Sequence, residues 1–333
     1  MTFEGADTPS FVLDGRNWRG GIGRFAAETL PFLPAHRLVQ SSRRPTHPAA
    51  PIELAVALKR LGPSAGPFLS HGYVPPLAAP MPAIVTIHDL MYLRGHEAYS
   101  PSRSAYLTAL RPLYRRCAAV LTMSEAARDT VCRWLGDDAR VEAVGSGVAP
   151  RFRPAPDGVE PDLATVLYVG SRFRNKNVCG LLRGFARSEV ARTLEVTGSA
   201  DEWEPFVVRT GAEPSAIRYL GYLEEDALIA RYQRAGVLVM PSTEEGLGLP
   251  ALEAMACGAP VVYGNCSALS EVVGDAGVAV DPRDEQAIGQ AIDDVLGDPQ
   301  RRAELVARGL RRASSFTWSE VADRIVAVME RVS

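Results

Sequence analysis

The chain has 333 residues, of which 47% are hydrophobic and 23% are charged, and its formal net charge is −3. This length fits two domains of ordinary size, and the composition is that of a folded globular protein and not of a disordered or fibrous one. No run approaches the roughly 18 to 20 consecutive apolar residues that a membrane-spanning helix needs.

The five cysteines are an odd number and are scattered along the chain without a C-x-x-C pair. This usage favours free thiols in a reducing compartment over a disulfide framework or a zinc site. The first residues are acidic and lack the basic start and apolar core of a secretory signal. We therefore expect a cytoplasmic location, and we expect no nucleic-acid partner.

Charge is distributed unevenly along the chain. Residues 1–150 carry 16 Lys and Arg against 12 Asp and Glu, whereas the remainder carries 20 against 27. A basic first half suits an anionic acceptor or peripheral contact with a membrane, and the segment 102–116, which mixes Arg and Tyr, is the part best suited to docking there. Pro112 breaks that helix, however, and a solvated helix in a half with an accidental charge imbalance is the simpler interpretation.

Short apolar runs alternate with helical patterns through the first half. They predict strands at 11–13, 37–39, 67–69, 83–87, 119–123 and 141–144. Because these runs lack strict polar alternation, they suit strands buried on both faces of a parallel sheet. Ser124 follows the fifth run and is a suitable N-cap for the next helix.

The second half repeats the rhythm after a linker at 149–158 that holds three prolines. Strands are predicted at 165–169, 194–196, 217–220, 237–240, 260–263 and 278–280. A helix near the end of this half has an apolar stripe that includes Ala287, Ile288 and Ile292, and Gly297 ends it. The alternation predicts an α/β protein made of two Rossmann-like, doubly wound domains, at 1–150 and 159–318, that face each other across a cleft.

The most informative segment follows the strand predicted at 237–240 and reads E-G-L-G-L-P-A-L-E-A-M-A-C-G over residues 245–258. Its glycines let backbone amides approach a ligand, and the helix start marked by Pro250 favours a phosphate. Glu245 at the strand end and Glu253 in the first helical turn are expected to border one pocket and to accept hydrogen bonds from sugar hydroxyls. The simpler alternative is that Glu253 only complements the helix dipole and that Glu245 is a solvated loop charge.

This segment resembles the signature of the retaining glycosyltransferases of family 4, which have the GT-B fold and carry two glutamates eight positions apart. The one departure is Leu247, where the family usually has an aromatic residue. The resemblance implies that Glu245 holds the hydroxyls of the donor sugar and Glu253 the ribose of the nucleotide. It also implies that Gly248 and Leu249 contact the donor through their backbone.

A second match is Y-V-G-S-R-F-R-N-K-N over residues 168–177, which resembles the strand, glycine and basic loop of the same family. By this resemblance Arg172 and Lys176 clamp the donor diphosphate, whose negative charge builds as it leaves. Arg174 is the alternative for either position. Two solvated loop cations would be the simpler interpretation of the segment on its own.

In the first half, the loop at 20–23 with Gly21 and Gly23 resembles the family's loop under the diphosphate, and His88 with Asp89 resembles its His-Asp motif near the reacting centre. Asp89 is a candidate for orienting His88. Among the other histidines, His71 is the best candidate, because it follows a predicted strand. The segment 316–318 and the apolar helix after it resemble the family's tail, so residues 319–333 are expected to pack back on the first domain.

The resemblance implies transfer of a hexose, with retention, from a nucleoside-diphosphate sugar held by the second domain to an acceptor on the first. No D-x-D motif is present, so we expect no metal and no cofactor. GDP-mannose is the first choice of donor, with a saccharide or lipid-linked acceptor in surface glycan synthesis. The alternatives are a GT-B-fold nucleotide-sugar epimerase, which lacks this glutamate spacing, and a non-catalytic subunit that binds a sugar nucleotide, which the sequence leaves open.

Overall fold

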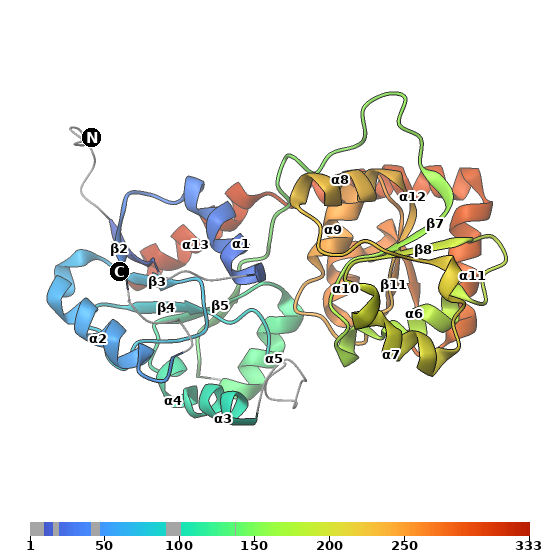
Figure 1. Cartoon of the computed structure of the whole chain (residues 1–333). Helices are drawn as coiled ribbons and strands as arrows, with labels where there is room; N and C mark the ends of the chain where they lie inside the picture. The colour runs from blue at the N-terminus through green and yellow to red at the C-terminus, as the bar shows by residue number, and fades with distance from the viewer. Residues whose placement is uncertain (1–9, 16–19, 41–46, 91–100, 137) are drawn as a thin grey trace. The chain divides into compact units, whose positions relative to one another are not determined.

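A computed structural model of the chain describes residues 10–15, 20–40, 47–90, 101–136 and 138–333 (Figure 1). It divides into two compact units: the first unit comprises residues 1–147 and 317–333, and the second unit comprises residues 148–316. Each unit contains a six-stranded parallel sheet. The α/β class with two doubly wound sheets is therefore confirmed. No helix of the described residues is long and apolar enough to cross a membrane.

The sheet of the first unit has the strand order β2-β1-β3-β4-β5-β6. Its strands are β1 (Phe11–Asp14), β2 (His36–Val39), β3 (Phe68–Ser70), β4 (Ala83–Thr86), β5 (Ala119–Thr122) and β6 (Val141–Ala143). All six lie close to the predicted positions. The four inner strands β1, β3, β4 and β5 are buried along their whole length, whereas the edge strands β2 and β6 are only partly buried. The chain winds in opposite directions from β1 and β3, and ligands of such sheets bind beyond the carboxyl ends of strands at this kind of switch point.

The helices of the first unit are α1 (Gly20–Thr29), α2 (Ala50–Leu61), α3 (Pro101–Ala109), α4 (Arg111–Tyr114), α5 (Glu125–Leu135) and α13 (Trp318–Val332), with short 3₁₀ turns at Leu30–Phe32 and Pro63–Ala65. Ser124 caps α5, because its hydroxyl accepts the backbone N–H of Ala127 at 3.1 Å. The basic segment breaks at Leu110, and Leu107, Leu110 and Tyr114 are buried in the core. Its apolar face therefore packs inside the unit.

The sheet of the second unit has the strand order β12-β11-β10-β7-β8-β9. Its strands are β7 (Asp162–Tyr168), β8 (Thr193–Val196), β9 (Ile217–Tyr219), β10 (Ala235–Met240), β11 (Val261–Gly264) and β12 (Val278–Val280). This is the order of a dinucleotide-binding sheet, whose switch point lies between its first and fourth strands in chain order, here β7 and β10. The loops that follow these two strands carry the glutamate and basic motifs found in the sequence.

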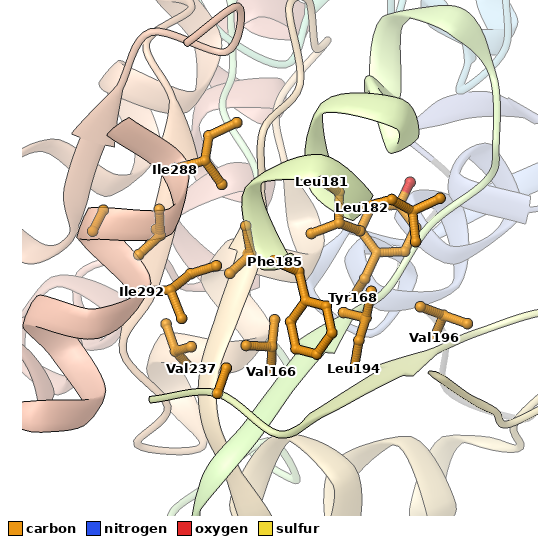
Figure 2. Close-up of a cluster of buried hydrophobic side chains, with 14 of the residues drawn as sticks. Val166, Tyr168, Leu181, Leu182, Phe185, Leu194, Val196, Val237, Ile288 and Ile292 are labelled. Carbon is orange, nitrogen blue, oxygen red and sulfur yellow. The ribbon is translucent and has the colours of Figure 1, made fainter. Parts of the chain in front are cut away.

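The helices of the second unit are α6 (Val178–Phe185), α7 (Ala200–Thr210), α8 (Glu225–Arg234), α9 (Leu249–Ala256), α10 (Ser267–Val273), α11 (Glu285–Gly297) and α12 (Pro299–Ser314), with 3₁₀ turns at Arg174–Lys176, Pro214–Ala216 and Gly274–Ala276. Helices α6, α7 and α11 cover one face of the sheet. Figure 2 shows Phe185 of α6 and Ile292 of α11 meeting the strand residues Val166 and Val237. Of the predicted stripe of α11, Ile288 and Ile292 are buried and Ala287 is partly buried, and Gly297 ends the helix.

The chain passes between the units at two places. The predicted linker begins the second unit, and its Phe152 is buried there beside Tyr232, with ring centroids 6.3 Å apart. The chain returns to the first unit at Thr317, after which α13 buries Trp318, Val321 and Ile325 and contacts α1. The buried stripe of α13 thus completes the core of the first unit.

Candidate active site

An ion pair joins the two loops at the switch point of the second unit. The ammonium Nζ of Lys176 lies 2.7 Å from both carboxylate oxygens of Glu245. The side chain of Glu245 is 6% exposed and that of Lys176 is 19% exposed. Because Lys176 follows β7 and Glu245 follows β10, neighbouring strands of the sheet, the fold brings together two residues that are 69 positions apart.

Two asparagines hold these loops in place, and sequence reasoning missed both. The Asn175 side chain donates to the backbone carbonyl of Glu244 at 3.0 Å, and the backbone carbonyl of Asn175 accepts the backbone N–H of Thr243 at 2.8 Å. Asn177 has a φ of 51°, in the left-handed region that asparagine tolerates better than most residues. Its amide donates to the carbonyls of Pro241 and Pro282. The position of Lys176 between them is therefore fixed by backbone contacts on either side.

The two arginines of the basic loop have different surroundings. Arg172 donates to the carboxylate of Glu202 at 2.5 Å, and its side chain is 21% exposed. Glu202 also accepts the backbone N–H of Ser199, the largest cause that holds the pKa of this carboxyl below its usual value. Arg174 is exposed, and within the described residues it makes no ion pair. The choice between the two arginines as a diphosphate ligand therefore stays open.

Glu253 lies in the second turn of α9, not in the first turn as predicted. It is 4% exposed, and one carboxylate oxygen accepts the hydroxyl of Tyr232 at 2.9 Å. Tyr232 comes from α8 and is fully buried. Glu253 therefore lies outside the first turn, where a carboxylate would complement the helix dipole, and the buried Glu245 is not the solvated loop charge of the simpler alternative.

Helix α9 begins one residue earlier than predicted, at Leu249, and Pro250 takes its second position. Gly248 is the N-cap, with a φ of 103° that residues with a side chain rarely adopt. A Cβ there would lie 2.3 Å from Leu269 of α10, so the site tolerates only glycine without rearrangement. No side chain caps the start of α9, and the first backbone N–H groups of a helix have no partner within the helix.

His88 follows β4 in the first unit and is half-buried. Its Nε2 lies 2.8 Å from the backbone carbonyl of His71, and because a carbonyl only accepts, Nε2 carries the proton and Nδ1 keeps its lone pair. Burial lowers the pKa of His88 to about 4, against a smaller opposing effect of this hydrogen bond. The imidazole is therefore neutral at pH 7, and the contact that orients it comes from His71, a partner that the sequence did not suggest.

His71 lies where β3 ends and is 1% exposed. Neither of its ring nitrogens has a hydrogen-bond partner within the described part of the chain. Burial, followed by the nearby His88, lowers its pKa to about 4, while Asp14 acts in the opposite direction. Asp14, at the end of β1, accepts the hydroxyl of Ser70 at 2.6 Å. Polar side chains from three strand ends thus gather at the switch point of the first unit.

The glycine loop opens α1 as predicted. Gly21 and Gly23 lie in its first turn, where Gly21 is exposed and a Cβ would meet nothing within 4 Å. The structure therefore places the two glycines at a helix start, whereas residues 16–19 before them lie outside the described residues. Among the described side chains, no group of three or more His, Cys, Asp and Glu is arranged to hold a metal ion.

Comparison with known proteins identifies the family of this chain. Residues 17–152 match the family described as Glycosyltransferase Family 4, and residues 164–298 match that described as Glycosyl transferases group 1. The O-antigen chain mannosyltransferase B of Escherichia coli is 33% identical over 71% of this chain and 67% of its own length. The chain belongs to glycosyltransferase family 4. The motifs at 168–177 and 245–258 are the residues that carried the same resemblance in the sequence.

Other relatives and solved structures agree with this placement. The phosphatidyl-myo-inositol mannosyltransferase of Mycolicibacterium smegmatis is 30% identical over 77% of this chain and 67% of its own length. A glycogen synthase of Mycobacterium tuberculosis is 31% identical over 73% of this chain, which spans 61% of that relative. HepE of Anabaena, solved with UDP-glucose, has a TM-score of 0.76 at 16% identity. The structural match covers 97% of this family 4 chain and 99% of the HepE chain. The fold is that of the GT-B glycosyltransferases.

Proposed function

We propose that this glycosyltransferase moves a hexose, with retention, from a nucleoside-diphosphate sugar to a saccharide or lipid-linked acceptor without a metal. The observation that carries the proposal is the Lys176–Glu245 ion pair at the switch point of the second unit. The diphosphate and the sugar of such a donor are covalently adjacent, so a cation and a carboxylate in contact match the two groups. Lys176 faces the diphosphate, and Glu245 accepts hydroxyls of the sugar.

The remaining groups of the second unit complete the donor site in this proposal. The unfilled N–H groups at Gly248 and Leu249 bind a phosphate oxygen, and Arg172, or Arg174 in its place, adds a second cation. Glu253, held by Tyr232, accepts the ribose hydroxyls. These fixed charges stabilise the diphosphate as it departs, which is the role that a metal ion has in other transferases.

The transfer itself breaks the bond between the anomeric carbon and the phosphate oxygen and forms a bond from that carbon to the acceptor oxygen on the same face. The acceptor's proton passes to the departing phosphate oxygen. His88 belongs to the first unit, with Gly21 and Gly23, and presents a neutral imidazole whose Nδ1 accepts a hydrogen bond from a substrate hydroxyl. We assign it to holding a reacting sugar and not to carrying charge.

Mannose from GDP-mannose is the donor group that we propose first, because the relatives named above include two mannosyltransferases. The glycogen synthase and the UDP-glucose complex of HepE favour a glucosyl donor as the second candidate. Surface glycan synthesis fits the O-antigen relative. The basic first half then faces an anionic membrane surface from the cytoplasmic side. It does so through charge and not through insertion, because Leu107 of α3 and Tyr114 of α4 are buried in the core.

The test begins with thermal shift and calorimetry on GDP, UDP and ADP, because a ligand that binds only the folded protein stabilises it by mass action. We expect GDP to bind most tightly. The matching sugar nucleotides are then incubated with and without candidate acceptors, and free diphosphate and new glycoside are measured.

Transfer, or slow donor hydrolysis, supports the proposal. Binding of a diphosphate without any turnover of its sugar nucleotides would indicate the non-catalytic subunit instead, and interconversion of two sugar nucleotides without an acceptor would indicate an epimerase. Tighter binding of UDP, with turnover of UDP-glucose, would replace mannose by glucose and leave the rest of the proposal in place.

A further inference from the structure

One aromatic ring in the first unit contacts three others that come from distant parts of the sequence. The ring of Phe25, in α1, lies edge-on to His71 and to His88, with centroids 5.4 Å away in both cases and interplanar angles of 80° and 88°. It also contacts Trp318 of α13, with centroids 5.7 Å apart and an angle of 73°. Phe25 is 1% exposed and Trp318 is 4% exposed.

These contacts limit how His88 can move. The hydrogen bond from Nε2 to the carbonyl of His71 fixes one edge of the imidazole but leaves rotation about that bond. The Phe25 ring restricts this rotation of the imidazole, because a buried ring in edge-to-face contact occupies a defined place beside it. Phe25 keeps its own place only while its other neighbours fill the space around it, and Trp318 is the largest of these.

Trp318 is itself tightly held. Thr317 caps α13 through its hydroxyl, which accepts the backbone N–H of Glu320 at 3.3 Å, and this fixes the start of the helix. A Cβ on Gly147 would lie 2.5 Å from the backbone nitrogen of Trp318 and 2.8 Å from its ring, so the two segments pack without room for a methyl group. Trp318 is thus placed by the same short stretch through which the chain re-enters the first unit.

We propose that Trp318 is a positioning residue for His88, and that it acts through the ring of Phe25 to fix the orientation in which Nδ1 meets the substrate. This inference rests on the function proposed above for His88. It gives the segment 317–333 a part in catalysis besides burying an apolar face. It also makes the aromatic character of position 318 matter, since an aliphatic side chain leaves a gap beside Phe25.

The experiment compares Trp318→Leu and Trp318→Phe with the control Trp134→Leu. Trp134 makes an aromatic contact of the same kind with Tyr114, at 5.5 Å and 64°, but belongs to the core around α4 and α5. For Trp318→Leu we expect kcat to fall tenfold or more. The affinity for the free diphosphate should stay within twofold, since the cations and the start of α9 that are proposed to bind it lie in the second unit. Trp318→Phe should recover most of the loss, and Trp134→Leu should keep kcat despite a lower stability.

Two further readouts separate positioning from a general loss of structure. In a His88→Ala background, Trp318→Leu should lower kcat no further, because the group it positions is gone. The imidazole ¹H–¹⁵N signals of His88 should shift in Trp318→Leu and not in Trp134→Leu. Unchanged kcat in Trp318→Leu, an equal loss in both backgrounds, or unmoved His88 signals would overturn the inference. If the wild-type chain turned over no donor, the proposed function would fail, and the His88 signals would decide the inference alone.

Discussion

Glu245 and Glu253 have different contacts although they belong to one short motif. The Lys176 ammonium pairs with Glu245, whereas the hydroxyl of Tyr232 donates to Glu253. In the function proposed above, Glu245 contacts the sugar that is transferred, beside the departing diphosphate. Glu253 contacts the ribose, a part of the donor whose charge does not change. The two glutamates should therefore differ in kinetics.

We predict that Glu253→Ala mainly raises the donor KM, because the ribose contact is the same in the ground state and the transition state. Glu245→Gln keeps the shape of the side chain and removes its charge, so kcat should fall by about 10²-fold, as for other contacts that strengthen in the transition state. Steady-state kinetics and calorimetry of the free diphosphate test both variants. Normal turnover by Glu245→Gln, or a loss of diphosphate binding as large as that of Glu253→Ala, would contradict the assignment.

The two histidines at the switch point of the first unit, His71 and His88, predict a pH dependence of stability. Burial lowers the pKa of His71 and of His88 to about 4 from an ordinary value of 6.5. The unfolded chain therefore binds protons first, so stability is complete above about pH 6.5 and is lost as the pH falls toward 4. Between pH 7 and 5 each histidine should remove about 2 kcal/mol from the free energy of unfolding of the first unit.

Urea denaturation at the two pH values measures this loss. In His88→Asn the loss should shrink, because one of the two groups no longer titrates. An identical pH dependence in that variant would show that other groups are responsible.

Several side chains that contact the predicted site residues could not be found from the sequence. Glu245, Glu253 and Lys176 stand in local motifs whose spacing is visible in the chain. Tyr232 is 21 positions from the carboxylate that it holds, and Glu202 is 30 positions from Arg172. Tyr232, Glu253 and Glu202 lie on the helices α8, α9 and α7. Such pairs form only when the folded unit packs distant elements together, and a single sequence carries no signal for them.

At the scale of elements, α9 is the part of the site whose position is most sensitive to a change of backbone conformation. Gly248→Ala would place a Cβ at a φ of 103° and against Leu269. We expect the free energy of unfolding to fall by about 2 kcal/mol, from strain and contact together, and the donor KM to rise at least tenfold. The donor KM rises because the substitution displaces the start of α9.

The matched control is Gly211→Ala. This glycine ends α7 with a φ of 66°, and a Cβ there meets nothing within 4 Å. The control should lose about 1 kcal/mol of stability from strain alone and keep the wild-type KM. Chemical denaturation and donor kinetics on both variants make the comparison, and equal KM values would remove α9 from the donor site.

All twelve strands lie close to the apolar runs that predict them, because the inner strands of each sheet are covered on both faces and are apolar along most of their length. The start of α9 was predicted one residue late and Glu253 was placed one turn early. Proline is tolerated at both of the first helical positions, so Pro250 marked the helix start only to within a residue. The break between α3 and α4 near Pro112 was predicted correctly, since proline cannot continue a helix.

At the scale of the whole molecule, the proposed chemistry uses fixed charges in place of a metal. Lys176, an arginine and the start of α9 supply the positive potential for the diphosphate in this proposal. We therefore predict that EDTA leaves the rate of transfer within twofold, and that added Mg²⁺ or Mn²⁺ gives no stimulation. Complete loss of activity with EDTA, followed by recovery with either ion, would reveal a metal requirement.

The second unit is continuous in sequence, whereas the first unit is assembled from residues on either side of it. Where the second unit begins and ends, the backbone N–H of Val148 donates to the carbonyl of Phe316 at 3.0 Å, so its two ends lie together. During synthesis the whole second unit leaves the ribosome before α13 does. Most of the first unit is synthesised first. Its apolar surface beside α1 therefore stays uncovered until the second unit and then α13 have emerged from the ribosome. The nascent chain should need protection by a chaperone at this stage, and the second unit should be the one to fold first.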